Sequence, residues 1–252
     1  MKNNDTSHRL GEEGKNNQGL MMKIIEYRRP VDITVQFNES GAKVNTDYYR
    51  FIKGAVLDPY HKTAYGKGYI GEGEFTVKGN KVIYTTWRNM FQRCYYDKFH
   101  ETHRSYKDCE VSPKWFNFQD FAQWYTDNHY SVEEETMNLD KDILVKGNKV
   151  YSPDTCCFVP RTINMLFVKS NNIRGIYPIG VSYNKQKKKY EAYIQTNRKR
   201  INLGYHNTIE EAFVVYKFKK EKIIKEVAKK YKELIPMRLY DSLINYKVDI
   251  ND

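Results

Sequence analysis

Residues 139–167 read LDKDILVKGNKVYSPDTCCFVPRTINMLF and lie near the middle of the chain. Two short runs rich in β-branched and aromatic residues flank a turn at Gly147-Asn148, which is typical of two paired strands. A short helix is expected to begin near Pro160, because proline suits the first position of a helix. The stretch therefore predicts a β-hairpin followed by a helix, within an α+β fold.

Two amphipathic helices are expected upstream, over residues 86–95 and 117–125. In both, apolar side chains recur at the i, i+3, i+4, i+7 spacing that lines one face of a helix. The residues that share these faces are Trp87, Met90, Phe91 and Cys94 in the first helix, and Phe118, Phe121, Ala122 and Tyr125 in the second. Together with the hairpin, these helices assign residues 61–170 to one central domain.

Residues 176–231 predict three strands and a helix. Alternating apolar and polar residues place the strands over 179–183, 190–196 and 200–205. The helix is expected to begin at Thr208, because Thr208 and Glu211 have the spacing of a capping box. Residues 171–252 are therefore expected to form a three-stranded sheet packed on a helix, followed by a last helical segment over 235–246.

The first sixty residues predict a tail and a small β-module. Residues 1–19 are polar and are expected to form a flexible tail. Residues 20–60 contain short β-forming runs, among them MKIIEYR at 22–28 and DITVQF at 32–37, followed by Tyr48, Phe51, Gly54 and Pro59. This pattern resembles the small β-rich repeat that accompanies DNA-processing proteins of phages and prophages; a folding or docking module is the simpler interpretation. The glycine-rich run GKGYIGEG, residues 66–73, would bind phosphate only between a strand and a helix N-terminus, whereas the residues after it predict a hairpin.

The charge is unevenly distributed along the chain. Its 252 residues carry a formal net charge of +11. Residues 171–252 hold 18 Lys and Arg against 9 Asp and Glu, a net +9, whereas residues 1–170 hold 24 against 22, a net +2. A localised excess of this kind is typical of a domain that binds a polyanion, and double-stranded DNA is the expected partner.

The composition excludes several classes of protein. Aromatic residues make up 15% of the chain, which is incompatible with a wholly disordered protein. No apolar run approaches the roughly 18 residues of a membrane span, so no membrane partner is expected. No segment typical of a secretory signal opens the sequence, and four cysteines do not make a disulfide scaffold. We therefore expect a cytoplasmic protein; the oligomeric state stays open.

A series of motifs follows a fixed order between residues 87 and 156. They are Trp87, Met90 and Arg93-Cys94, then Val111, Trp115, Phe118 and Phe121, then Leu139-Asp140-Lys141, and last Tyr151-Ser152-Pro153-Asp154-Thr155-Cys156. In this order they resemble a subgroup of phage HNH homing endonucleases. The resemblance implies a ββα-metal fold in which one divalent ion, Mg²⁺ or Mn²⁺, assists phosphodiester hydrolysis, and the cytoplasm of a bacterial host cell as the location.

This resemblance also implies the roles of individual residues. Asp140 takes the position of a metal ligand, Lys141 that of the general-base His, and Thr155 that of a metal-binding Asn. A lysine with its usual pKa near 10.4 is a poor base at neutral pH, so Lys141 as a phosphate contact stays open, as does a solvated Asp140–Asp142 face. The candidate metal ligands are Asp140, Asp154 and Thr155, and the candidate catalytic residues are Asp140, Lys141, Asp142 and Asn164.

Residues 179–216 carry a second set of motifs. They are Gly180-Val181, Tyr190-x-Ala192-x-Ile194, Leu203-Gly204-Tyr205 and Thr208-x-Glu210-Glu211-Ala212. They resemble the plant APETALA/ethylene-response-factor DNA-binding domain. The resemblance implies that the sheet lies in the major groove and that the helix braces it from behind.

Strand alternation divides the sheet residues between two faces. Expected to face the helix are Val181, Ala192, Ile194, Ile201 and Leu203. On the other face, the resemblance implies base or backbone contacts, including readout of adenine by Asn or Gln, from Ser182, Asn184, Tyr193, Gln195, Arg200 and Asn202. Phosphate contacts are expected from Lys185, Lys187, Lys188, Lys189, Arg198 and Lys199. A basic but merely solvated sheet face is the alternative.

Four residues of zinc-binding type lie between the two upstream helices, namely Cys94, His100, His103 and Cys109. Their spacing matches no common zinc finger, and Cys94 lies on an apolar helix face, so the sequence does not favour a structural zinc ion. A catalytic Cys–His pair has no supporting pattern.

The combined motifs predict a DNA-binding protein of a phage or mobile element that nicks or cleaves duplex DNA, as a free-standing homing endonuclease does. The alternative is a DNA-binding regulator that keeps the nuclease fold without its activity, which Lys141 and Thr155 favour. An RNA-binding module has less support, because the strands show no aromatic pattern of the RNP type.

Overall fold

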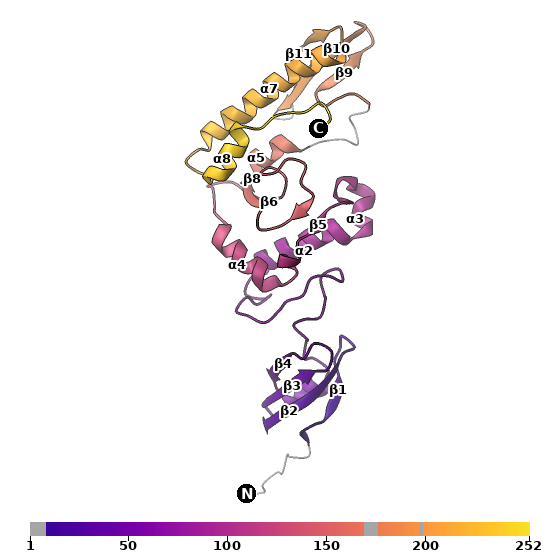
Figure 1. Ribbon diagram of the computed structural model, residues 1–252, viewed down its shortest axis with the longest axis vertical. Coiled ribbons are helices and arrows are strands. Elements are labelled where there is room, and N and C mark those ends of the chain that lie inside the picture. Colours follow the sequence, from indigo (N-terminus) through magenta and orange to yellow (C-terminus); the bar gives the residue numbers. More distant parts are fainter. Residues whose placement is uncertain (1–8, 169–175, 197–198) are drawn as a thin grey trace. The chain divides into compact units, whose positions relative to one another are not determined.

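The computed structural model describes residues 9–168, 176–196 and 199–252 (Figure 1). The protein is a mixed α+β structure with a four-stranded N-terminal sheet, helices in the middle and a C-terminal three-stranded sheet with a helix, which confirms the expected class. Asp127 and the described residues before it form one compact unit with Val150–Ser152, and Asn128–Lys149 form another with Pro153–Asp252. These units do not coincide with the expected division at residue 171. None of the helices in the described ranges is both long and apolar enough to cross a membrane.

The N-terminal sheet is antiparallel throughout, in the order β1-β2-β3-β4. Its strands are β1 (Glu13–Lys15), β2 (Met21–Arg29), β3 (Asp32–Phe37) and β4 (Lys43–Thr46), and helix α1 (Tyr48–Ile52) follows. Alternate residues of β2 and β3 form its core, namely Met22, Ile24, Ile33, Val35 and Phe37. Because β1 pairs with β2, the expected tail is corrected at residues 13–15, which belong to the sheet.

The middle of the chain contains helices α2 (Lys81–Tyr95), α3 (Asp97–Thr102) and α4 (Phe118–Asn128), with short 3-10 turns at Arg104–Tyr106 and Pro113–Trp115. On the predicted apolar faces every residue is buried except Tyr125, which is half-buried; the buried ones are Trp87, Met90, Phe91 and Cys94 in α2, and Phe118, Phe121 and Ala122 in α4. The indole Nε1 of Trp87 donates to the Trp115 carbonyl oxygen at 2.8 Å, which ties α2 to the segment before α4. Residues 74–80 form bends and turns instead of the expected hairpin.

The predicted hairpin and helix are present, but with a different second strand. Strand β6 (Met137–Asp140) pairs antiparallel with β8 (Cys157–Pro160), and α5 (Arg161–Asn164) follows with a 3-10 turn at Met165–Phe167. The residues after the Gly147-Asn148 turn form β7 (Val150–Tyr151), which pairs in parallel with β5 (Glu110–Val111). Tyr151 is buried in the first compact unit, so its segment leaves the hairpin.

The C-terminal sheet has the strand order β11-β10-β9 and is antiparallel. Its strands are β9 (Val181–Asn184), β10 (Lys189–Thr196) and β11 (Lys199–His206), followed by α7 (Ile209–Lys230) and α8 (Met237–Ile244). Both hydrogen bonds of the predicted capping box at Thr208 are present. Val181, Ala192 and Ile194 are buried as predicted. Ile201 is 43% exposed, which corrects its expected burial; it lies on the edge strand β11, outside the apolar cluster beneath α7.

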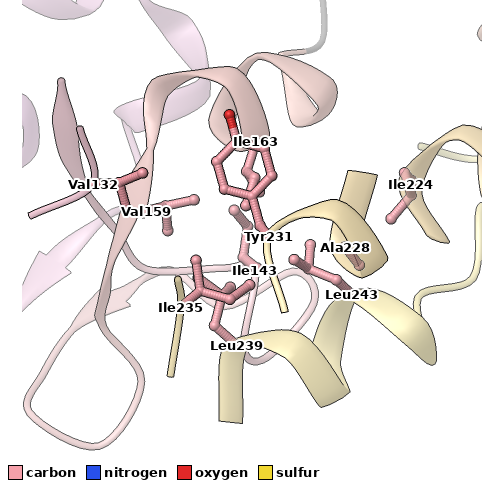
Figure 2. Close-up of a cluster of buried hydrophobic side chains, with 10 residues drawn as sticks. All are labelled: Val132, Ile143, Val159, Ile163, Ile224, Ala228, Tyr231, Ile235, Leu239 and Leu243. Atoms are coloured by element: carbon pink, nitrogen blue, oxygen red, sulfur yellow. The ribbon is translucent and has the colours of Figure 1, made fainter. Parts of the chain in front are cut away.

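Helix α7 takes part in two apolar clusters. Its first half contributes Ala212, Phe213 and Tyr216 to the core beneath the C-terminal sheet. Its second half contributes Ile224 and Ala228 to another cluster, shown in Figure 2, whose other members are Val132, Ile143, Val159, Ile163, Tyr231, Ile235, Leu239 and Leu243. One helix therefore stabilises both the C-terminal sheet and the β6–β8–α5 element.

Candidate nucleic-acid interface and candidate metal site

The C-terminal sheet brings most of the predicted DNA-contact residues onto one face. Tyr193 lies opposite Asn202, and Gln195 lies opposite Arg200, in the β10–β11 ladder. Directly opposed residues of an antiparallel pair share a face of the sheet. The residues brought together in this way are Ser182, Tyr193, Gln195, Arg200 and Asn202, on the face that is not covered by α7.

Glu191 lies among these residues and was missed by the sequence prediction. Its Oε2 accepts a hydrogen bond from Nη2 of Arg200 at 2.8 Å, and its Oε1 accepts one from Nδ2 of Asn202 at 2.8 Å. Arg200 Nη2 also donates to the Ser182 hydroxyl oxygen at 2.7 Å. The alternation that assigned Tyr193 and Gln195 to this face would have assigned Glu191 to it as well.

Arg200 and Asn202 are each held by more than one partner. The guanidinium carbon of Arg200 lies 3.5 Å from the ring centroid of Tyr193, a cation–π contact. Asn202 Oδ1 accepts the backbone N–H of Gly204 at 2.8 Å, across a bulge that leaves Leu203 without an opposing residue. Because both polar atoms of the Asn202 amide are bonded within the sheet, bidentate readout of adenine would require these bonds to break.

Asn184 has a role within the β9–β10 turn. Its Oδ1 accepts the backbone N–H of Lys187 at 3.0 Å, and Lys188 has a φ of +52°. The side chain that was expected to contact DNA therefore shapes the turn that carries the lysines.

Exposed lysines border this face. Within the described residues none of them forms an ion pair, and the Lys187 ammonium lies 3.7 Å from the ring centroid of Tyr205. We call this set the rim lysines: Lys185, Lys187, Lys188, Lys189 and Lys199. Arg198, also expected to contact phosphate, lies outside the described residues. Gln195 is exposed and makes no side-chain hydrogen bond to the described part of the chain.

Comparison of the chain with family models, with curated proteins and with solved structures found no match.

Asp140, the candidate metal ligand, lies at the end of β6. Its Oδ1 accepts the backbone N–H groups of Asp142 at 2.9 Å and of Ile143 at 2.8 Å. Burial and the nearby Asp142 carboxylate raise the pKa of Asp140 to about 6. Cys157 lies opposite it in the ladder, and burial together with the Asp140 charge raises the pKa of that thiol. Asp140 and Asp142 thus form a pair of interacting carboxylates at the end of β6.

Lys141 is buried within the loop that follows β6. The residue is 8% exposed, and its Nζ donates to the Asn148 carbonyl oxygen at 3.2 Å. The Asp142 carboxylate lies 3.5 Å from the same Nζ, and Asn148 Nδ2 donates back to the Lys141 carbonyl at 2.7 Å. Lys141 therefore closes the loop between β6 and β7, and its burial argues against both expected roles.

The remaining candidates lie on the segment before β8 and on α5. Asp154 is exposed, while Thr155 and Asn164 are half-buried. No group of three or more His, Cys, Asp and Glu side chains suited to a metal ion occurs in the described ranges. Magnesium is commonly held by one or two carboxylates and completed by water and substrate phosphates, so Asp140 and Asp142 are the residues that could hold such an ion.

A hollow of about 360 Å³ lies beside the loop that follows Asp140. Ile143 and Leu144 line one part of it, and residues 245–249 line another. Its three lysines are already engaged: Lys146 binds Asp252 at 2.8 Å, Lys217 donates to the Val248 carbonyl at 2.7 Å, and Lys247 lies 3.8 Å from the Glu221 carboxylate. These bonds leave the hollow poorly suited to a phosphate.

The candidate zinc residues each have a local role. His100 Nε2 lies 2.7 Å from the Arg93 carbonyl oxygen, and the His103 ring stacks on Phe99 with centroids 4.1 Å apart. Cys94 and Cys109 are buried thiols. These contacts explain the four residues as parts of the local packing.

Proposed function

We propose that the protein binds duplex DNA through the outer face of its C-terminal sheet. The observation that carries the proposal is the row of rim lysines, which are exposed and lack ion pairs within the described residues, around a face of ordered polar side chains. Ammonium groups at a rim suit phosphates, which position a protein on DNA. The major groove is wide enough for a small sheet, whose polar side chains can reach base edges there.

Salt-dependent binding tests this proposal. If six to eight phosphates are neutralised, the logarithm of the association constant should fall against the logarithm of salt concentration with a slope of about −5 to −7. Replacing Lys185, Lys188 and Lys199 together by Gln should reduce that slope by about three. The matched control replaces three exposed lysines of α7, namely Lys222, Lys229 and Lys230. A wild-type slope near zero would contradict DNA binding by this face.

Metal-dependent cleavage of DNA is the second candidate function. It is supported by Asp140, which lies beside Asp142 at the end of β6, in a two-stranded hairpin followed by a helix. Mg²⁺ or Mn²⁺ bound by these carboxylates would supply charge stabilisation for phosphodiester hydrolysis. The residues of the chain would hold the ion, while the buried Lys141 would keep the loop in place.

A nicking assay separates this candidate from a regulator without activity. Supercoiled phage and host DNA would be incubated with the protein and with Mg²⁺ or Mn²⁺, in parallel with Asp140→Asn. Nicks that depend on the metal and disappear in the variant would support an endonuclease. Binding without nicks on every substrate would favour the regulator.

A further inference from the structure

A carboxylate at the centre of a DNA-binding face needs an explanation. Glu191 is the one acidic residue in strands β9, β10 and β11. Its side chain is 14% exposed, on the face that carries Tyr193 and Asn202. A carboxylate near phosphates is repelled by them, so this residue weakens binding to the DNA backbone.

Glu191 also determines where the charge of Arg200 lies. The guanidinium is fixed by the Glu191 carboxylate at 2.8 Å, by the Ser182 hydroxyl at 2.7 Å and by the ring of Tyr193 at 3.5 Å. A guanidinium paired in this way adds little to counterion release, because its charge is already balanced within the protein. Nη2 makes both hydrogen bonds, and the Nε–H and Nη1–H groups have no partner among the described residues.

We propose that Glu191 is a positioning residue that sets sequence specificity. It holds Arg200 on Tyr193 and away from phosphates, so that the unpaired Nη1 group of Arg200 meets a guanine edge in the major groove. Guanine presents two neighbouring acceptors, O6 and N7, to which the two hydrogens of Nη1 can donate, as the ammonium of a lysine does, and a pre-ordered guanidinium loses less entropy when it binds them. This inference rests on the proposed DNA binding. It assigns the phosphate contacts to the rim lysines and the recognition of a base to the Glu191–Arg200 pair, which has no net charge.

Two measurements on the full chain test the inference. The first is selection from a random duplex library, in which the wild type should prefer guanine at one position by about 5- to 150-fold. Both Glu191→Gln and Arg200→Ala should lose that preference. The matched control is Glu226→Gln, which removes one negative charge from an exposed position of α7 and should keep the preference.

The second measurement is the salt dependence of binding to one random duplex. Glu191→Gln frees Arg200 for a phosphate, so the slope of log affinity against log salt should become steeper by about one. Between 50 and 200 mM salt, this variant should therefore lose about threefold to fourfold more affinity than the wild type. Glu191→Asp keeps the charge and should keep the wild-type slope. The double variant Glu191→Gln/Arg200→Ala removes both charges and should also keep that slope, because the wild-type pair is neutral and its arginine does not contact phosphate.

Three results would overturn the inference: wild-type slope and preference in Glu191→Gln, a slope as steep in Glu191→Asp as in Glu191→Gln, or a slope shallower by about one in the double variant Glu191→Gln/Arg200→Ala. Circular dichroism on each variant shows whether it is folded, and if Glu191→Gln is unfolded the double variant Glu191→Gln/Arg200→Ala decides. Failure of the proposed DNA binding itself would be seen first, as a wild-type protein without salt-dependent affinity.

Discussion

Gly180 lies against the ring of Tyr216, so closely that a Cβ atom built on Gly180 would be 2.0 Å from Cδ2 of the tyrosine. Gly180 also has a φ of +78°, in the left-handed region that favours glycine. Tyr216 is buried in the apolar cluster between the sheet and α7. Glycine at position 180 is therefore what lets the start of β9 approach the helix.

Gly180→Ala should lower the free energy of unfolding by roughly 2–4 kcal/mol, because it adds both a backbone strain and a clash with a packed ring. The control is Gly147→Ala, where φ is +80° but no atom lies within 4 Å of the added Cβ. That variant should lose only about 1 kcal/mol. Denaturant unfolding followed by circular dichroism measures the free energy of unfolding of both variants. Equal losses in the two variants would show that the contact with Tyr216 does not contribute to stability.

The elements that the sequence predicts well are those with local causes. Strand β3 follows the alternation of Ile33, Val35 and Phe37, and the start of α7 follows the capping box of Thr208 and Glu211. In each case the decisive contacts join residues close in the chain. The same holds for the C-terminal sheet, where alternation alone assigns Tyr193 to the face that α7 does not cover.

The features that the sequence does not predict depend on distant contacts. The partner of β6 is β8 rather than β7, because Tyr151 is buried in the first compact unit, where its hydroxyl accepts a hydrogen bond from Arg93 at 3.3 Å. Lys141 is buried because Asn148 and Asp142 surround its ammonium. The alternation of β11 assigns Ile201 to the side that faces α7. It does not show that this edge of the sheet lies beyond the cluster beneath α7.

Lys141→Met tests whether this lysine is structural. The methionine keeps an apolar stem but removes the hydrogen bond to the Asn148 carbonyl, so the free energy of unfolding should fall by about 1 kcal/mol. Any nicking activity at a temperature where the variant is fully folded should be retained. Loss of activity without loss of stability would restore a catalytic role for Lys141.

Ile163→Ala tests whether α7 couples the hairpin element to the C-terminal sheet. Ile163 is fully buried in the cluster of Figure 2, and truncation of such a residue costs about 2–5 kcal/mol. Since α7 belongs to both clusters, hydrogen exchange should become faster throughout α7, including the turn of Tyr216. The control is Ile24→Ala, an equally buried residue of the N-terminal sheet, which should leave exchange in α7 unchanged. Exchange that speeds up only beyond Ile224 would show that the two clusters open separately.

Lys220 gives the protein a pH dependence that can be measured. Burial lowers the pKa of Lys220 from its ordinary value of 10.5 to about 8. Between these two pH values the unfolded chain binds more protons than the folded one, so this group makes the free energy of unfolding rise with pH across that window. Below pH 8 the lysine is charged in both states, and its desolvation cost is constant.

Lys220→Met should therefore stabilise the protein at pH 7, by on the order of 1–2 kcal/mol, with the gain vanishing toward pH 10.5. Denaturant unfolding from pH 7 to pH 10.5 gives the difference between variant and wild type, which cancels the tyrosines and cysteines common to both. Lys222→Met, at an exposed position of the same helix, should show no such trend, and a gain in Lys220→Met that stays constant over the whole range would refute the buried charge.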